Sequence, residues 1–92
     1  MGNKNAKPDL MDVALDLKMN SRQLLKQADK IQQSEAAERK KVLAYMNKGD
    51  MESAKIFAEN AIRARKEATH VRRFGVKMQA LASKVEGAAR TQ

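Results

Sequence analysis

Asn47-Lys48-Gly49-Asp50 interrupts a chain whose composition otherwise favours continuous helix. Gly49 suits the left-handed backbone conformation in which many helices end, because it has no Cβ atom. Asp50 can then cap a following helix by accepting hydrogen bonds from its first amides. Because no residues remain for a long loop, the two helices must run antiparallel and side by side. The sequence therefore predicts a helical hairpin that turns at residues 47–50.

A helix is predicted before the turn, over residues 9–47. Residues 1–8 are polar and aperiodic and are interpreted as a flexible tail, while Asp9 and Asp12 offer an N-cap and a first-turn carboxylate. Apolar or small residues then recur at alternating steps of four and three, the spacing of a coiled-coil seam. The two glutamates in this first seam are its weak points. Its members are Leu10, Ala14, Leu17, Ser21, Leu24, Ala28, Ile31, Glu35, Glu38, Val42 and Tyr45.

A second helix is predicted after the turn, over residues 51–90. Its seam is rich in alanine and contains Gly75, so the two backbones can approach closely and the Leu and Ile side chains of the first helix can reach across. At 1.5 Å per residue each helix would be about 60 Å long. The predicted fold is all-α, a long antiparallel two-helix rod. The second seam consists of Ala54, Phe57, Ala61, Ala64, Ala68, Val71, Gly75, Met78, Ala82, Val85 and Ala89.

The composition argues against an enzyme. The 92 residues contain no cysteine and a single histidine, His70, so neither a disulfide, a thiolate nucleophile nor a usual zinc site is expected. No Ser/His/Asp set, glycine-rich phosphate loop or H-E-x-x-H motif occurs. We predict no catalytic residue, no metal and no cofactor. Without eighteen consecutive apolar residues or an apolar N-terminal stretch, the chain is expected to be cytoplasmic.

The formal net charge of +8 favours polyanionic partners: nucleic acid, acidic lipid or an acidic protein. Basic residues recur every four positions along the first helix and should sweep its outer face, with Asp29 as the one adjacent acid. An ordinary solvated helix face would also explain this row. The row and its extension towards the turn are Lys18, Arg22, Lys26, Lys30, Arg39, Lys40 and Lys41; the second helix adds Arg63, Arg65, Lys66, Arg72, Arg73, Lys77 and Lys84.

Several large apolar residues fall off both seams, and a two-helix rod cannot cover two faces at once. They imply contacts with further helices, from a longer chain or from neighbouring copies. Because the pattern stops at Thr91-Gln92 without a helix-stop signal, the sequence is interpreted as truncated before later helices. On the first helix these residues are Leu15, Leu25 and Leu43. The predicted partner-helix contacts are Ile56, Ile62, Phe74, Val76 and Leu81.

Residues 48–63, KGDMESAKIFAENAIR, look like the turn and the start of the second helix of ESCRT-III subunits. Within this stretch, Ala58-Glu59-Asn60-Ala61-Ile62-Arg63 is similar to the type 1 charged multivesicular body proteins. The resemblance extends from about Leu10 to Ala89, and the basic first helix agrees with it.

The resemblance implies a scaffold subunit recruited from the cytoplasm to endosomal membranes, where it polymerises with itself and with other ESCRT-III subunits in multivesicular body sorting and membrane scission. An AAA ATPase would bind only through a C-terminal tail that this sequence lacks. An anionic membrane would be contacted by Lys18, Arg22, Lys26, Lys30, Arg39, Lys40 and Lys41. The alternative is a basic helical nucleic-acid-binding protein, although no helix-turn-helix, zinc or leucine-zipper signature appears.

Overall fold

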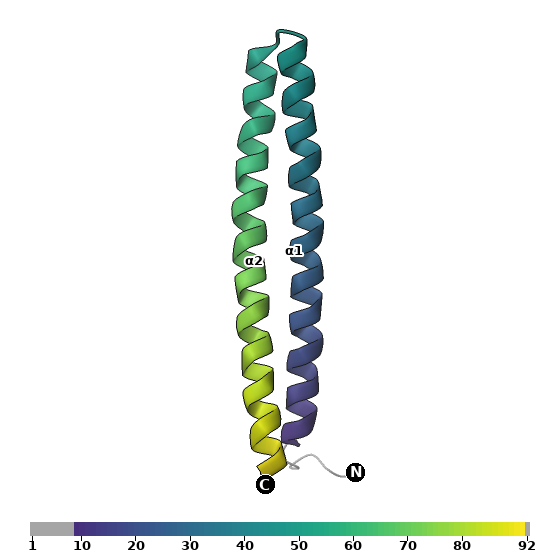
Figure 1. The fold of residues 1–92 in the computed structure, drawn as a ribbon, viewed down its shortest axis with the longest axis vertical. Coiled ribbons are helices and arrows are strands. Elements are labelled where there is room, and N and C mark those ends of the chain that lie inside the picture. The colour runs from purple at the N-terminus through teal and green to yellow at the C-terminus, as the bar shows by residue number, and fades with distance from the viewer. Residues whose placement is uncertain (1–8, 92) are drawn as a thin grey trace, which may run out of the picture.

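A computed structural model describes residues 9–91, which form two long helices in one antiparallel hairpin (Figure 1). Helix α1 runs from Leu10–Asn47 and helix α2 from Met51–Thr91, against predicted ranges of 9–47 and 51–90. The longest dimension of the rod is 66 Å. The predicted all-α hairpin is confirmed. The predicted tail at residues 1–8 lies outside the described part of the chain.

Both helices begin at an aspartate that caps them. The backbone N–H of Met11 donates to Asp9 Oδ1 over 3.2 Å. At the second cap, the N–H of Ser53 donates to Asp50 Oδ1 over 3.0 Å and the Ser53 hydroxyl donates to Oδ2 over 2.7 Å. The hydroxyl bond, followed by the backbone bond, holds the pKa of Asp50 below its ordinary value. These bonds satisfy amides that a helix cannot pair internally.

The core is a thin layer of small residues between the helices. No large side chain in the described range is fully buried. Larger seam residues such as Leu24 and Val71 are half-buried along the edges of this layer. Every predicted seam position is buried or half-buried, so the two predicted seams are confirmed. The buried residues are Ala14, Ser21, Ala28, Ala54, Ala61, Ala68, Gly75 and Ala82.

Leu25 lies beside the seam positions, as predicted, but the expectation that a further helix is needed to cover it is wrong. Its side chain is half-buried against Gly75 of α2. A Cβ atom placed on Gly75 would lie 3.0 Å from Leu25 Cδ2 and 3.3 Å from Leu24 Cβ. The missing side chain of the glycine thus leaves the space that Leu25 occupies from the edge of the seam.

Two aromatic rings close the core beside the turn. Tyr45 and Phe57 stack with their ring centroids 5.2 Å apart and their planes 13° from parallel. Lys41 Nζ lies 5.2 Å from the centroid of Phe57, and Lys48 Nζ lies 5.1 Å from that of Tyr45. Each ammonium is within range of a cation–π attraction. The turn end of the rod is therefore held by the largest side chains in the interface.

We expect Gly49→Val to destabilise the hairpin. Gly49 has φ of 78°, and no heavy atom lies within 4 Å of the position that its Cβ would take. The cost is therefore one of backbone conformation, about 1–2 kcal/mol for an L-residue and more for a β-branched one. Urea unfolding followed by circular dichroism measures it. Gly49→Asn should cost less, because asparagine tolerates this conformation; equal stability of all three proteins would contradict the assignment.

Candidate functional site

Three residues of the predicted basic row form an exposed strip on the outer face of α1: Arg22, Lys26 and Lys30. Lys40 continues this strip towards the turn, because it lies fourteen residues, or two heptads, after Lys26. Asp29 is directed away from the strip, since its Oδ1 accepts a hydrogen bond from Arg72 of α2 over 3.0 Å. The four basic residues of the strip are named the α1 outer face.

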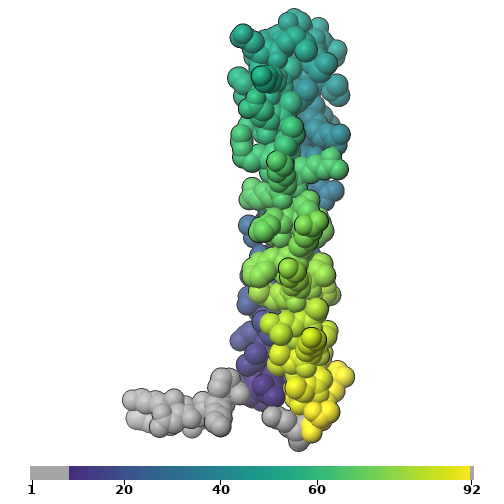
Figure 2. All heavy atoms as spheres, turned by 90° about the vertical axis from the view of Figure 1, so that its left-hand side faces the viewer, coloured from purple at the N-terminus to yellow at the C-terminus, as the bar shows by residue number. Residues whose placement is uncertain are grey.

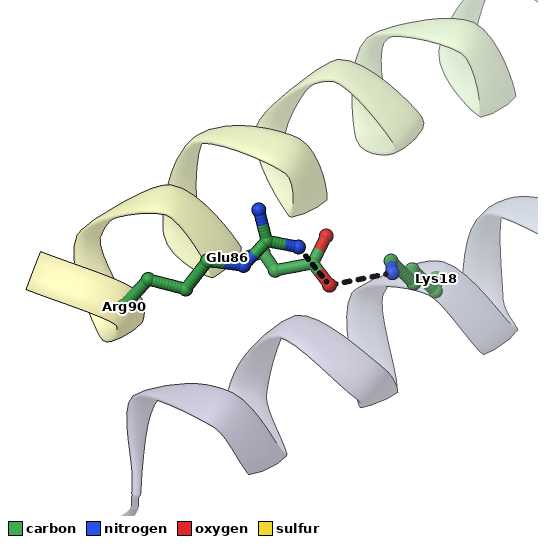
Figure 3. Close-up of polar contacts among 3 residues, drawn as sticks. All are labelled: Lys18, Glu86 and Arg90. Atoms are coloured by element: carbon green, nitrogen blue, oxygen red, sulfur yellow. Dashed lines mark hydrogen bonds and ion pairs between the residues drawn. The ribbon is translucent and has the colours of Figure 1, made fainter.

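Lys18 does not share that face, although the sequence predicted it there. Its Nζ donates to Glu86 Oε2 of α2 over 3.0 Å, and Arg90 Nη2 lies 3.3 Å from the same oxygen (Figure 3). The hydrogen bond from Lys18 is the main cause of the lowered pKa of Glu86, and the positive charges of Lys18 and Arg90 add to it. Lys18 thus serves as a link between the helices at the open end of the rod.

Arg39 and Lys41, also predicted to contact lipid, lie beside the seam. Arg39 lines a shallow apolar groove between the helices together with Arg65 and Ile62. Lys41 lies over Phe57 and 3.8 Å from Glu38 Oε1. The other carboxylate oxygen of Glu38 is buried without a hydrogen-bond partner in the described range. The structure therefore divides the seven predicted residues between the α1 outer face and the interhelical edges.

A second basic surface lies on the opposite side of the rod. Figure 2 looks onto α2, with α1 behind it. Four exposed residues, here named the α2 outer face, project from this helix, and none was among the predicted site residues. Two pairs of them lie one heptad apart, a spacing from which the sequence could have indicated a common face. They are Lys66, Arg73, Lys77 and Lys84.

The predicted partner-helix contacts are all exposed, by between 49% and 59% of their surface. They divide between the two flanks of the seam. Phe74 and Val76 are the neighbours of Gly75 on either side in the sequence, so their side chains diverge from the seam in opposite directions. Ile62 shares the flank of Val76 and joins Leu43 in the groove. Ile56 and Leu81 lie towards the flank of Phe74.

No conventional chemical site is evident within residues 9–91. In this range no group of three or more His, Cys, Asp or Glu residues lies close enough together to hold a metal ion. His70 is exposed on α2. Neither α1 nor α2 has a stretch long and apolar enough to cross a membrane. The candidate site is therefore a charged surface and not a pocket.

Comparison with known proteins identifies charged multivesicular body proteins as relatives of this chain. No family model and no solved structure matches the chain. It is 37% identical over 90 residues to the ESCRT-related protein CHMP1B of Arabidopsis thaliana and 40% identical over 74 residues to charged multivesicular body protein 1 of Dictyostelium discoideum. The resemblance to the type 1 charged multivesicular body proteins is confirmed. Human charged multivesicular body protein 1b is 37% identical over 68 residues.

These alignments cover most of the chain but less than half of each relative. The Arabidopsis match takes in 98% of this chain and 43% of that protein. The Dictyostelium match takes in 80% and 38%, and the human match 74% and 34%. The hairpin thus corresponds to only part of a charged multivesicular body protein.

Proposed function

We propose that the hairpin belongs to an ESCRT-III-like scaffold subunit that polymerises on anionic membranes and takes part in multivesicular body sorting and membrane remodelling, including scission. The observation that carries this proposal is the exposed α1 outer face, on a chain whose relatives are charged multivesicular body proteins. Each Lys or Arg near an anionic bilayer contributes about 1 kcal/mol of attraction. Four such residues on one side of a rigid rod supply enough for peripheral binding from the cytoplasm to endosomal membranes.

Lys18, Arg39 and Lys41 support the membrane contact from the edges of the rod in this proposal. Lys18 is paired with Glu86 and Lys41 with Glu38, and Arg39 lies in the groove between the helices, so each contributes less than a residue of the α1 outer face. Copies of the chain and other ESCRT-III subunits would pack on the exposed apolar flanks. Each added subunit brings another basic face, and linked weak contacts give avidity that a single hairpin lacks.

A label on α1 tests the proposed membrane contact. Because the chain has no cysteine, Gln33→Cys introduces a unique attachment point for an environment-sensitive fluorophore on α1, two turns after Lys26. Its emission should change with vesicles containing phosphatidylserine and not with neutral phosphatidylcholine vesicles. Several hundred millimolar salt should remove this change in emission, because it shortens the electrostatic screening length to a few ångströms. Changing Arg22, Lys26, Lys30 and Lys40 together to Gln should also abolish it.

The same label on Gln79→Cys, at the exposed edge of α2, is the matched control. It should respond much less than the label at position 33. A response at position 33 that persists in high salt or with neutral vesicles would indicate hydrophobic insertion and overturn the electrostatic mechanism. Tighter binding to duplex DNA than to acidic vesicles at matched salt would favour the nucleic-acid alternative.

A further inference from the structure

The rod carries two basic faces that point in opposite directions. Arg22, Lys26, Lys30 and Lys40 lie on the α1 outer face and Lys66, Arg73, Lys77 and Lys84 on the α2 outer face. None of these eight side chains forms an ion pair with the residues that the structure describes. The acids that lie between the helices are occupied by other partners: Asp29 by Arg72, and Glu86 by Lys18 and Arg90. Glu59 lies beside Lys66, but all eight basic side chains are exposed to solvent.

The two faces are too far apart to act on one flat surface. A helix with its side chains is about 10–12 Å across, so the faces of a two-helix rod are separated by roughly 20 Å. At physiological ionic strength the Debye length is about 8 Å. The charges of α2 are therefore screened from a bilayer that contacts α1, and they remain available to a second anionic surface.

Exposed apolar side chains accompany the charges on both helices. On α1, Leu15 and Met19 precede the basic strip and are exposed. On α2, Ile62 lies beside Lys66 and Arg73 in one shallow depression. Val76 lies beside Arg73 and Lys77 in the next. A basic surface interspersed with apolar side chains suits the boundary between lipid headgroups and acyl chains, whereas a phosphate backbone offers no apolar layer.

We propose that a single hairpin bridges two anionic bilayers, one on the α1 outer face and one on the α2 outer face. This inference rests on the proposed membrane binding of α1 and adds a second, opposed membrane site. The length of the rod lets each helix lie along its own bilayer, and the rigid core fixes the spacing between the two surfaces. The chain would then hold apposed membranes at a separation close to its own thickness.

Vesicle clustering separates bridging from binding. The full chain should cluster phosphatidylserine vesicles, seen as an increase in hydrodynamic size by dynamic light scattering. One variant changes the four basic residues of the α1 outer face to Gln, and the other changes the four of the α2 outer face. Each variant loses four charges from +8, so their net charges match. Glutamine is used because glutamate would create acidic faces that attract the remaining basic ones.

Each single-face variant should still co-sediment with the vesicles, with an affinity within about tenfold of the parent, and each should lose the clustering. A variant with both faces neutralised should lose binding as well.

Clustering that survives neutralisation of either face would show that paired copies connect the vesicles, because the apolar flanks are intact in both variants. That result would overturn the proposal. Binding by the parent without clustering would also overturn it, while leaving the proposed scaffold function in place. Absence of binding by the parent would refute both. Duplex DNA can also be added, at equal phosphate concentration, to the variant that binds vesicles only through its α2 outer face. If the DNA displaces that variant from the vesicles, the second surface is a nucleic-acid site and the bridging proposal fails.

Discussion

Gly75→Leu should lower the free energy of unfolding of the hairpin by about 1–3 kcal/mol, the usual cost of overpacking a close interface. Even a single Cβ at this position would meet Leu25 Cδ2 at 3.0 Å and Leu24 Cβ at 3.3 Å. The side chain of Leu25 can rotate away, but Leu24 Cβ is fixed to the backbone of α1. The helices must therefore separate. Their separation also weakens the neighbouring alanine layers. Urea unfolding at one protein concentration measures the change.

Gly87→Leu is the matched control, because it lies in the same helix with no heavy atom within 4 Å of its Cβ position. Replacing a helical glycine there removes a helix-destabilising residue and should raise the free energy of unfolding by about 0.5–1 kcal/mol. Gly75→Ala should fall between these results, since improved helix propensity opposes the tight contact. Equal stabilisation by leucine at positions 75 and 87 would show that the helices do not meet at Gly75.

The seams and the turn could be predicted from the sequence because each depends on local rules. Coiled-coil spacing selects the side of a helix that is buried, and a glycine followed by an aspartate matches a helix end followed by a cap. Position 49 has the left-handed conformation and Asp50 caps α2, as these rules require. The spacing therefore predicts which side of each helix is buried, and the short turn predicts that the helices run antiparallel.

The ion pair of Lys18 and the burial of Leu25 depend on the register between the helices. Both residues lie at the same edge of the α1 seam, one heptad apart. Which residue of α2 faces each of them is set by the length and geometry of the turn, and helical periodicity does not contain that information. Glu86 happens to face Lys18, and Gly75 faces Leu25. The α2 outer face is difficult to predict for a different reason: its basic residues are visible in the sequence, but they lack the regular four-residue spacing of the row on the first helix.

The largest effect expected on assembly concerns the exposed apolar flanks, through which we predict weak self-association. Burial of a large apolar side chain contributes roughly 1.5–3 kcal/mol, and about half of the surface of these residues remains exposed in the hairpin. Pairing of the flank that carries Ile56, Phe74 and Leu81 would gain several kcal/mol before the cost of association is subtracted. Dissociation constants on the order of 0.1–1 mM are then expected.

Analytical ultracentrifugation over a hundredfold range of concentration should show a mass that rises from one copy to two. Phe74→Asp with Leu81→Asp should leave a monomer, because a carboxylate cannot enter an apolar contact without losing its hydration. Ile62→Asp with Val76→Asp introduces the same charge on the other flank and should reduce pairing less, since it leaves the aromatic ring in place. All four side chains are exposed, so circular dichroism should show the same helix content in each variant. A parent chain that remains monomeric throughout, or one whose pairing is indifferent to Phe74→Asp and Leu81→Asp, would contradict the prediction.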